Sequence, residues 1–369
     1  MERPLSPKQG ESEFQQSLRL NVSLAPMTTI GIGGPARYFF DASSVEGLIA
    51  SVAWARSRDL PLFVLGGGSN IVVADDGFRG LVVRVALRGG TTRVEGDRAI
   101  VTASAGRDWD HVVATCVGRN WAGLECLSGI PGRVGATPIQ NVGAYGQETS
   151  ETLVSLEALN LATGELEELK AAECDFGYRT SRFKTRDRER FIITSVTYQL
   201  AVNGKPAVRY PELERCVAAQ GAAEPTLEQV RESVLSLRRR KAMVIDSHDP
   251  DSRSVGSFFV NPIVTREECE QIRMRADKLV AHGEEMPAFP APDDRVKLAA
   301  AWLIERAGIN RGFAHGGVGT STKHALAIVN RGGGTAREIV ELKELIQSRV
   351  LDAFGVALAP EPVFIGFES

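Results

Sequence analysis

The sequence has no apolar run long enough to cross a membrane. A spanning helix needs about 20 apolar residues, and no stretch of 18 or more in this 369-residue chain is continuously apolar. The longest uncharged windows, residues 20–36 and 60–74, are interrupted by Gly, Pro and Asn. The N-terminal segment MERPLSPKQGESEFQQ also lacks the apolar stretch of a signal peptide. We therefore expect a cytoplasmic protein with no membrane partner.

An excess of one charge sign is also absent. The 43 Lys and Arg residues and the 46 Asp and Glu residues leave a net charge of −3. Nucleic-acid binding depends largely on a positive field that neutralises phosphates. We therefore expect no nucleic-acid partner, although a local basic patch could still bind a small anion.

Cysteine and histidine are scarce, and their spacing argues against two kinds of site. The five cysteines are scattered and form no CxxC pair, and the five histidines show no HxxxH or HxH spacing. This pattern is typical of reduced thiols in a cytosolic enzyme and argues against a disulfide framework or a zinc site. We predict no bound metal.

Two well-known catalytic signatures are missing too. No GxxxxGK[ST] string is present, which argues against a P-loop NTPase, and no GxSxG elbow is present, which argues against an acyl-enzyme serine. Residues 31–36 fit G-x-G-x-x-A, but they lead into the strand-like ARYFF and not into a helix. We interpret this match as accidental.

The chain otherwise has an ordinary globular composition, with 43% hydrophobic and 24% charged residues, and its length suffices for two or three domains. Residues 1–12 are expected to form a mobile tail, and residues 286–292 a loop. Capping-box pairs beginning at Ser43 and Thr226 predict helix starts. Periodicity predicts strands over residues 36–41, 62–65, 71–73, 99–104, 153–161, 191–200 and 324–330. It predicts further helices over residues 108–117, 265–278, 296–307 and 335–354. The pattern indicates an α+β protein of three domains.

Glycine is concentrated in two segments that could bind a ligand. The string GGGSN at residues 66–70 directly follows a predicted strand, and its glycines let backbone N–H groups approach an anion. A phosphate loop and a plain turn remain equally open there. Residues 128–146, SGIPGRVGATPIQNVGAYG, form a long tract with little regular pattern, which is typical of a functional or disordered segment. Its apolar residues argue against disorder, so we expect a flat ligand along this backbone, with a structural loop as the alternative.

Three shorter segments carry candidate chemical groups. Arg179 in FGYRTS suits either an exposed salt bridge or a clamp on a carboxylate. Ser257 in SVGSFFVNP is either part of a strand end or a positioned proton donor. Glu361 stands between two prolines, which make its backbone stiff. The basic run at residues 238–241 suits a helix C-terminus first and an anionic substrate second.

Taken together, these strings resemble the UDP-N-acetylenolpyruvoylglucosamine reductase family. The resemblance covers residues 24–366 in order, which is nearly the whole chain. It rests on TTIGIGGPA, GGGSN, GLECLSGIPGRVGATPIQNVGAYG, FGYRTSRFK, VGSFFVNP, VKLAAAWLIERAG and PEPVFIG. The long glycine-rich string and GSFFxNP are far more specific than any single glycine motif.

The resemblance implies a vanillyl-alcohol-oxidase/PCMH-like FAD-binding fold in two subdomains plus a third α+β substrate-binding domain. We accordingly expect a flexible tail at residues 1–17 and a first FAD-binding subdomain at 18–88, to which residues 359–369 return. The second FAD-binding subdomain would cover residues 89–240, and the substrate-binding domain residues 241–358.

The resemblance also assigns catalytic and cofactor residues. By motif, the catalytic residues of the family fall on Arg179, Ser257 and Glu361. GGGSN would hold the FAD pyrophosphate, and the second glycine-rich tract would run along the flavin. The FAD-binding residues would be Gly66, Gly67, Gly68, Ser69, Asn70, Ser128, Gly129, Ile130, Gly132, Gly135, Ala136, Thr137, Gln140, Asn141, Gly143, Ala144 and Tyr145.

Substrate contacts of the family fall on Tyr210, Lys241 and Asn261. The position of Tyr210 in VRYPELERC favours the family type in which a tyrosine loop closes over the substrate. Pro211 stands where a glycine is expected in that loop.

The resemblance implies NADPH-dependent reduction of UDP-N-acetylglucosamine enolpyruvate to UDP-N-acetylmuramate, a step of peptidoglycan precursor synthesis. FAD would relay the hydride to the terminal alkene carbon. Arg179 would stabilise the charge that develops on the neighbouring carbon and its carboxylate, and Ser257 would protonate that carbon. Glu361 would assist Arg179. We expect a monomer whose partners are this substrate and NADPH.

Two other functions remain as alternatives. A flavin-dependent oxidase or dehydrogenase of a small alcohol would share GGGSN, but it has no reason to keep FGYRTS, GSFFVNP and PEPVFIG together. A nucleotide-binding regulator without activity has no reason to keep Arg179, Ser257 and Glu361.

Overall fold

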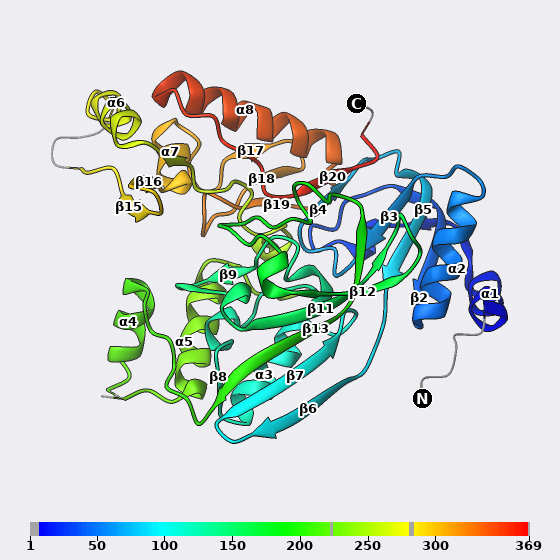
Figure 1. The fold of residues 1–369 in the computed structure, drawn as a ribbon. Coiled ribbons are helices and arrows are strands. Elements are labelled where there is room, and N and C mark those ends of the chain that lie inside the picture. The colour runs from blue at the N-terminus through cyan, green and yellow to red at the C-terminus, as the bar shows by residue number, and fades with distance from the viewer. Residues whose placement is uncertain (1–6, 222–223, 280–283, 368–369) are drawn as a thin grey trace. The chain divides into compact units, whose positions relative to one another are not determined.

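The chain folds into two compact units, each assembled from separate stretches of sequence. Figure 1 shows the computed structural model, which describes residues 7–221, 224–279 and 284–367. The first unit consists of the described residues of Met1–Val22, Ala36–Gly68 and Phe78–Val244, and the second of those of Ser23–Pro35, Ser69–Gly77 and Ile245–Ser369. The three-part division expected from the sequence stays a prediction.

The first unit begins with a helix where the sequence predicts a mobile tail. Helix α1 covers Pro7–Ser17, and Phe14 is only 2% exposed because its ring packs on Phe40 and Trp54. The carboxylate of Glu13 accepts a hydrogen bond of 2.6 Å from the Ser43 hydroxyl. The prediction was wrong for these residues because one buried aromatic in a polar segment gives little periodic signal.

A mostly parallel sheet follows α1, with strand order β1-β2-β5-β3 and strand β5 parallel to both β2 and β3. Helix α2 is capped by Ser44, whose hydroxyl accepts a hydrogen bond from Gly47 N, so the cap lies one residue later than predicted. The elements are β1 (Arg19–Ser23), β2 (Pro35–Ala42), α2 (Val45–Arg56), β3 (Leu62–Leu65) and β5 (Phe78–Val85).

An antiparallel sheet completes the first unit. Its order is β12-β11-β13-β7-β6, and β8 also pairs with β13. The elements are β6 (Gly90–Glu95), β7 (Arg98–Ser104), α3 (Trp109–Gly118), β8 (Trp121–Ala122), β9 (Gly143–Ala144), β10 (Gln147–Glu148), β11 (Leu153–Asn160), β12 (Leu166–Lys170), β13 (Phe191–Val202), α4 (Pro211–Ala218) and α5 (Leu227–Arg240). The predicted strands and helices of this region are confirmed to within a few residues.

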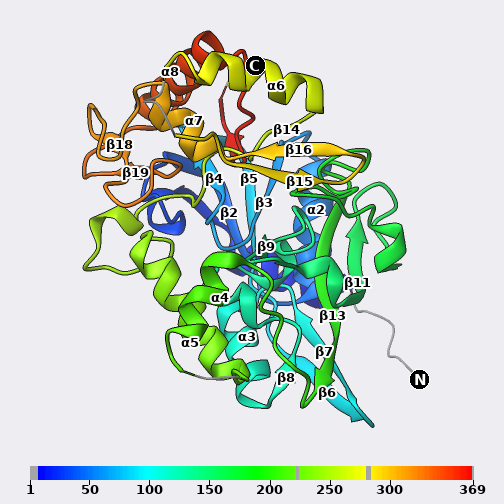
Figure 2. The ribbon, with the colours of Figure 1, turned by 90° about the vertical axis from the view of Figure 1, so that its left-hand side faces the viewer.

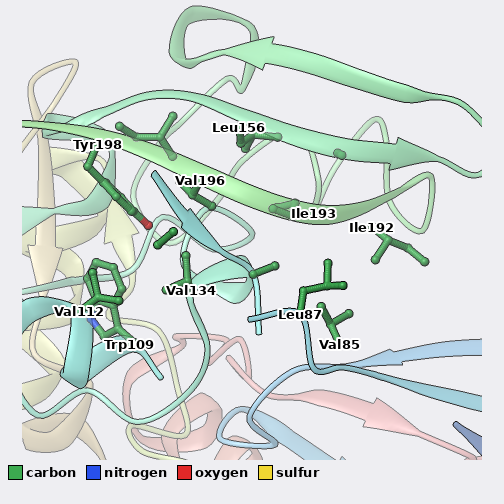
Figure 3. Packing of buried hydrophobic residues seen from close by; sticks show 14 of the residues in the cluster. Val85, Leu87, Trp109, Val112, Val134, Leu156, Ile192, Ile193, Val196 and Tyr198 are labelled. Atoms are coloured by element: carbon green, nitrogen blue, oxygen red, sulfur yellow. The ribbon is translucent and has the colours of Figure 1, made fainter. Parts of the chain in front are cut away.

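The core of the first unit lies between these elements. Figure 3 shows side chains from β11 and β13 meeting Val134 of the glycine-rich tract and Trp109 and Val112 of α3. Tyr198 is fully buried, and its hydroxyl lies 2.9 Å from that of Thr137. The tract is therefore held against the core along part of its length.

The described residues of the second unit form three small sheets and three α-helices. Strand β20, near the C-terminus, pairs in parallel with β4. In Figure 2, α6 runs above the sheet with strand order β14-β16-β15. The elements are β4 (Ile71–Val73), β14 (Ile263–Val264), α6 (Arg266–Ala276), β15 (Ala288–Ala291), β16 (Arg295–Leu298), α7 (Ala300–Arg306), β17 (Ala314–His315), β18 (Val318–Thr320), β19 (Ile328–Asn330), α8 (Ala336–Phe354) and β20 (Val363–Ile365).

Three predictions in the second unit need correction. The helix expected over residues 296–307 is strand β16 followed by the shorter helix α7. The loop expected over residues 286–292 contains β15, an edge strand that tolerates Pro290. The strand expected over residues 324–330 shrinks to β19. In the first two cases strand pairing overrides the local pattern, because short strands depend on their neighbours. In the third, a turn in which Ala327 N donates to His324 O at 3.1 Å replaces the start of the expected strand.

Candidate functional site

The GGGSN segment directly follows strand β3 and lies on the backbone of the second glycine-rich tract. A Cβ atom on Gly67 would stand 2.6 Å from Gly132 Cα, whereas one on Gly66 would stand at an ordinary 3.7 Å from Ala136 Cβ. Gly68 has a positive φ of 64°, a conformation that glycine adopts without strain. The two glycine segments therefore form a cradle of bare backbone in the first unit.

The tract over residues 128–146 is ordered by hydrogen bonds along its length. The Ser128 hydroxyl donates to Glu125 O at 2.6 Å, and the Thr137 hydroxyl donates to Val134 O at 2.8 Å. Gly135 N donates to Ala105 O at 2.9 Å, and a Cβ on Gly135 would stand 2.6 Å from Ala105 Cβ. These contacts exclude a disordered loop and hold the tract as a fixed ribbon.

A carboxylate that sequence analysis missed anchors the start of this ribbon. Asp110 on α3 accepts hydrogen bonds from Arg231 on α5 at 2.6 and 2.8 Å and from Gly129 N at 2.6 Å. Burial alone would raise the pKa of Asp110, but these hydrogen bonds outweigh it and hold the pKa below its ordinary value of 3.8. Asp110 therefore carries its charge at neutral pH and joins two helices to the ribbon.

A second carboxylate that was missed, Glu125, is fully buried before the ribbon. Its oxygens accept hydrogen bonds from Gly123 N at 2.7 Å and from Ala207 N at 2.8 Å. Ala207 lies three residues before Tyr210, so Glu125 links the segment that leads into the ribbon with the segment that leads to Tyr210. Glu125 lies in the GLECLSGIPG string, but no spacing rule distinguishes it from an exposed glutamate.

Arg179 lies over the far end of the ribbon. Its Nη2 donates to Gly143 O at 2.5 Å, and a Cβ on Gly143 would stand 2.9 Å from its Nη1. Asn141 donates to Gly177 O at 3.1 Å, and the Ser181 hydroxyl donates to Ile139 O at 2.5 Å. The loop that carries Arg179 is thus fastened to the ribbon on both sides of the guanidinium.

Ser257 and Glu361 lie on paired segments of the second unit. The residue after Ser257, Phe258, donates its N–H to Leu326 O at 2.8 Å and accepts from Glu361 N at 2.9 Å. Phe259 forms an isolated bridge with Pro360. The structure therefore brings these two predicted catalytic residues onto neighbouring backbones.

The last residue of GGGSN, Asn70, is joined to the same part of the second unit. Its Nδ2 donates to Glu361 O at 3.3 Å, and its carbonyl accepts from Val363 N at 3.0 Å. Ser69 and Asn70 belong to the second unit, whereas the three glycines before them belong to the first. The predicted phosphate loop therefore spans both units along the chain.

Asn261 has a structural bond in addition to its predicted substrate contact. Its Oδ1 accepts a hydrogen bond of 2.9 Å from Ala300 N, the first residue of α7. The preceding residue, Ala299, has no side chain that could cap this helix. The amide NH₂ of Asn261 is the group that could still donate to a ligand.

Tyr210 and Lys241, the other two predicted substrate residues, gather around Tyr145 in the first unit. The Tyr145 and Tyr210 rings meet edge to face with centroids 5.6 Å apart, and Lys241 Nζ lies 6.0 Å from the Tyr145 ring centre. Burial raises the pKa of Tyr145 to about 12. Tyr145 was predicted to contact the cofactor, and it also contacts both predicted substrate residues.

Pro211 occupies the first position of α4, directly after Tyr210. Proline suits that position because its fixed φ fits a helix and its missing N–H has no helical partner there. A proline in place of the expected glycine therefore opens a short helix behind Tyr210.

The predicted site residues divide between the two units. The ribbon, Arg179, Tyr210 and Lys241 belong to the first, and Ser257, Glu361 and Asn261 to the second. Within the described part of the chain, no group of three or more His, Cys, Asp or Glu side chains is arranged to hold a metal ion. None of the described helices combines the length and the apolar character needed to cross a membrane.

Comparison with known proteins gives the family. Residues 36–170 match the FAD binding domain family, and residues 249–365 match the UDP-N-acetylenolpyruvoylglucosamine reductase C-terminal domain family. The chain is 47% identical to UDP-N-acetylenolpyruvoylglucosamine reductase of Thermobifida fusca over 95% of its length and 98% of that protein. It is 46% identical to the enzyme of the same name from Saccharopolyspora erythraea over 93% of its length and 94% of that protein.

The fold has a counterpart among solved structures. The crystal structure of UDP-N-acetylenolpyruvylglucosamine reductase from Thermus caldophilus matches with a TM-score of 0.64 and 24% identity, over 94% of this chain and 99% of that one. The predicted FAD-binding fold is confirmed. The bare-backbone cradle suits FAD, because glycine lets main-chain N–H groups reach a pyrophosphate and lets a flat ring lie close. With FAD as its cofactor, the chain is a flavin-dependent oxidoreductase and belongs to the UDP-N-acetylenolpyruvoylglucosamine reductase family.

Proposed function

We propose that this protein reduces UDP-N-acetylglucosamine enolpyruvate to UDP-N-acetylmuramate with NADPH, in peptidoglycan precursor synthesis. Two observations support this most directly: in the second unit the Ser257 segment pairs with the Glu361 segment, and in the first unit Arg179 is held on the glycine-rich ribbon. An oxidase of a small alcohol needs no such set of groups. We further propose a cytoplasmic monomer whose partners are this substrate and NADPH, with no nucleic acid or membrane.

The cradle residues would hold the cofactor. Gly66–Asn70 would surround its pyrophosphate, and the ribbon from Ser128 to Tyr145 would lie along the flavin. Bound FAD supplies hydride transfer, which lets NADPH and the alkene react without meeting. The fixed hydrogen bonds of Ser128, Thr137 and Gly135 keep the ribbon in place before any ligand arrives.

Arg179 would stabilise the negative charge that develops when the alkene accepts hydride. That charge spreads from the carbon beside the ether oxygen onto the conjugated carboxylate. A guanidinium stays protonated at neutral pH and can bind a carboxylate through two parallel hydrogen bonds. Because Gly143 O already accepts from Nη2, the Arg179 side chain is aimed before the substrate binds.

Ser257 would protonate the carbon that carries the developing charge. A serine hydroxyl is a weak acid, so it must be held close to the carbon that it protonates. The backbone before it turns through Gly256, whose φ is 78° and whose N–H donates to the Ser254 hydroxyl at 3.2 Å. The Phe258 hydrogen bonds fix the backbone after it. Glu361, on the paired segment, would assist Arg179 in holding the intermediate.

Stopped-flow spectroscopy of the Ser257→Ala enzyme tests this assignment. We expect NADPH to bleach the flavin at the wild-type rate, and we expect the enolpyruvyl nucleotide sugar to reoxidise it about 10²–10⁴-fold more slowly, the usual contribution of a general acid. Ser348→Ala is the control, because it removes a hydroxyl from an exposed position of α8 and leaves the hydrogen bonds around Ser257 in place. Wild-type rates in both half-reactions of Ser257→Ala would exclude the proton-donor role. Rapid reoxidation of the wild-type flavin by air alone would favour the alcohol oxidase.

A further inference from the structure

Lys241 already has an anionic partner within its own unit. Its Nζ lies 2.5 Å from Oε2 of Glu212, and the two side chains are 34% and 32% exposed. Glu212 stands in the first turn of α4, two residues after Tyr210. The Glu212 carboxylate is thus paired with the Lys241 ammonium group, which we predict to contact the substrate.

The surroundings of this ion pair are rich in positive charge. Lys241 is the C-cap of α5, and Arg238, Arg239 and Arg240 form the last turn of that helix. Arg238 is partly buried; its Nη2 donates to Met243 O at 2.7 Å, and its buried Nε has no hydrogen-bond partner among the described residues. An anion is therefore favoured at this end of the helix, and Glu212 supplies one.

We propose that Glu212 acts as an internal competitor for Lys241, occupying it until an anionic group of the substrate replaces the carboxylate. The inference rests on the function proposed above, since it takes Lys241 as a substrate contact. When the substrate binds, its anionic group would replace the Glu212 carboxylate as the partner of Lys241 Nζ. The substrate offers two such groups, the diphosphate and the enolpyruvyl carboxylate.

The position of Glu212 links this exchange to Tyr210. Tyr210 is the N-cap of α4, its side chain is 41% exposed, and its ring contacts Tyr145. Leu213 and Val217 anchor the buried face of α4 against α5. Release of Glu212 from Lys241 breaks an ion pair at the end of α4 that carries Tyr210. The apolar contacts of Leu213 and Val217 with α5 remain.

The cost of the exchange should be modest. Glu212 is partly exposed, so water can solvate its carboxylate once Lys241 has left it, and half-exposed ion pairs contribute little to stability. Removing the competitor should therefore tighten substrate binding by between about twofold and tenfold. A residue with only a structural role would weaken binding or leave it unchanged.

The test measures substrate binding to the FAD-loaded Glu212→Gln enzyme in the absence of NADPH. Binding is detected through the change that it causes in the flavin absorbance spectrum. We expect Kd for the enolpyruvyl nucleotide sugar to fall by about twofold to tenfold. Glu214→Gln is the matched control, because it removes the same charge from the same turn of α4 at an exposed position. We expect its Kd to equal that of the wild type.

Two further arms complete the experiment. Lys241→Met should weaken binding, and adding Glu212→Gln to Lys241→Met should produce no further tightening. UDP-N-acetylglucosamine carries the diphosphate but lacks the carboxylate. If Glu212→Gln tightens both ligands equally, the diphosphate replaces Glu212; if it tightens only the full substrate, the carboxylate does.

An unchanged or raised Kd in Glu212→Gln would overturn the inference, and so would equal tightening by Glu214→Gln or tightening that persists beside Lys241→Met. These outcomes differ from failure of the proposed function. In that case the wild-type enzyme itself would neither bind the enolpyruvyl nucleotide sugar nor reoxidise with it.

Discussion

At the scale of single residues, close backbone contact distinguishes glycines that look alike in the sequence. Gly66 and Gly67 are neighbours in GGGSN, yet a Cβ on the first meets Ala136 Cβ at an ordinary 3.7 Å, and one on the second would stand 2.6 Å from Gly132 Cα. Real Cβ atoms do not approach a backbone atom that closely. The cradle therefore depends on Gly67 far more than on Gly66.

We predict that Gly67→Ala purifies without FAD, because the added methyl group must push GGGSN away from the ribbon. Gly66→Ala should keep its yellow colour and its FAD content. The measurement is the ratio of flavin to protein absorbance after purification, with thermal melting to confirm that both variants are folded. Equal FAD content in the two variants would contradict the cradle geometry.

Residue roles could be predicted from the sequence only where a motif identifies them. Arg179, Ser257 and Glu361 were assigned through resemblance, and these roles stay proposals. Asp110 and Glu125 were missed, because their importance comes from backbone N–H groups more than 15 residues away in the chain. No local pattern encodes such partners.

At the scale of elements, Asp110 joins α3, α5 and the ribbon. Asp110→Asn keeps the size of the side chain but weakens the bidentate pair with Arg231 and the bond from Gly129 N. We predict a loss of about 1–2 kcal/mol in unfolding free energy at pH 7, after allowance for partial exposure. Chemical denaturation of the two proteins gives the difference.

The same substitution predicts a pH dependence. The folded-state pKa of Asp110 is lowered below 3.8, so its contribution is fully present above about pH 4 and is lost as the pH falls through the folded-state pKa. The stability difference between wild type and Asp110→Asn should narrow on acidification. Asp97→Asn, at a 91% exposed carboxylate, should show no such difference at either pH. If the difference in unfolding free energy between wild type and Asp110→Asn stayed constant from pH 7 to pH 3, the predicted pH dependence would be wrong.

Helix α1 gives a second prediction at this scale, since it replaces an expected tail. Phe14 packs on Phe40 and Trp54 and is almost fully buried. Phe14→Ala should lower the unfolding free energy by about 3–5 kcal/mol. Gln15→Ala, at the exposed neighbouring position, should have almost no effect. A similar denaturation midpoint for both variants would mean that α1 adds nothing to the first unit.

Strong amphipathic helices and long strands were predictable, whereas short strands were not. Helix α8 and helix α5 have complete capping boxes and one apolar face, so their positions follow from local sequence. Strands β15 and β16 depend on pairing, since β16 pairs with both β15 and β14, and β15 contains a proline that marks a loop in most contexts. The pairing partners of such short strands decide whether they form, and local pattern alone does not.

At the scale of the whole molecule, the second unit is discontinuous in sequence. Its core includes Ile30 and Val72, both fully buried, together with the helices after residue 245. Strand β4, which carries Val72, pairs with β20 near the C-terminus. The three-part division suggested by the sequence, with its boundary at residue 241, stays a prediction; what the structure shows is that these early segments share a core with residues after 245.

This discontinuity predicts that a polypeptide of residues 245–369 will not fold alone. Without Ile30, Ile32 and Val72 its core has a gap, and β20 has lost its partner strand. We expect circular dichroism to show no cooperative thermal transition. We also expect the amide proton signals in its NMR spectrum to lack the chemical-shift dispersion of a folded protein. The matched control is the same polypeptide with residues 23–35 and 69–77 joined to it through flexible linkers, which should regain a transition. A cooperative transition in the shorter polypeptide would contradict this prediction, because it would show that residues 245–369 form a stable core without the early segments.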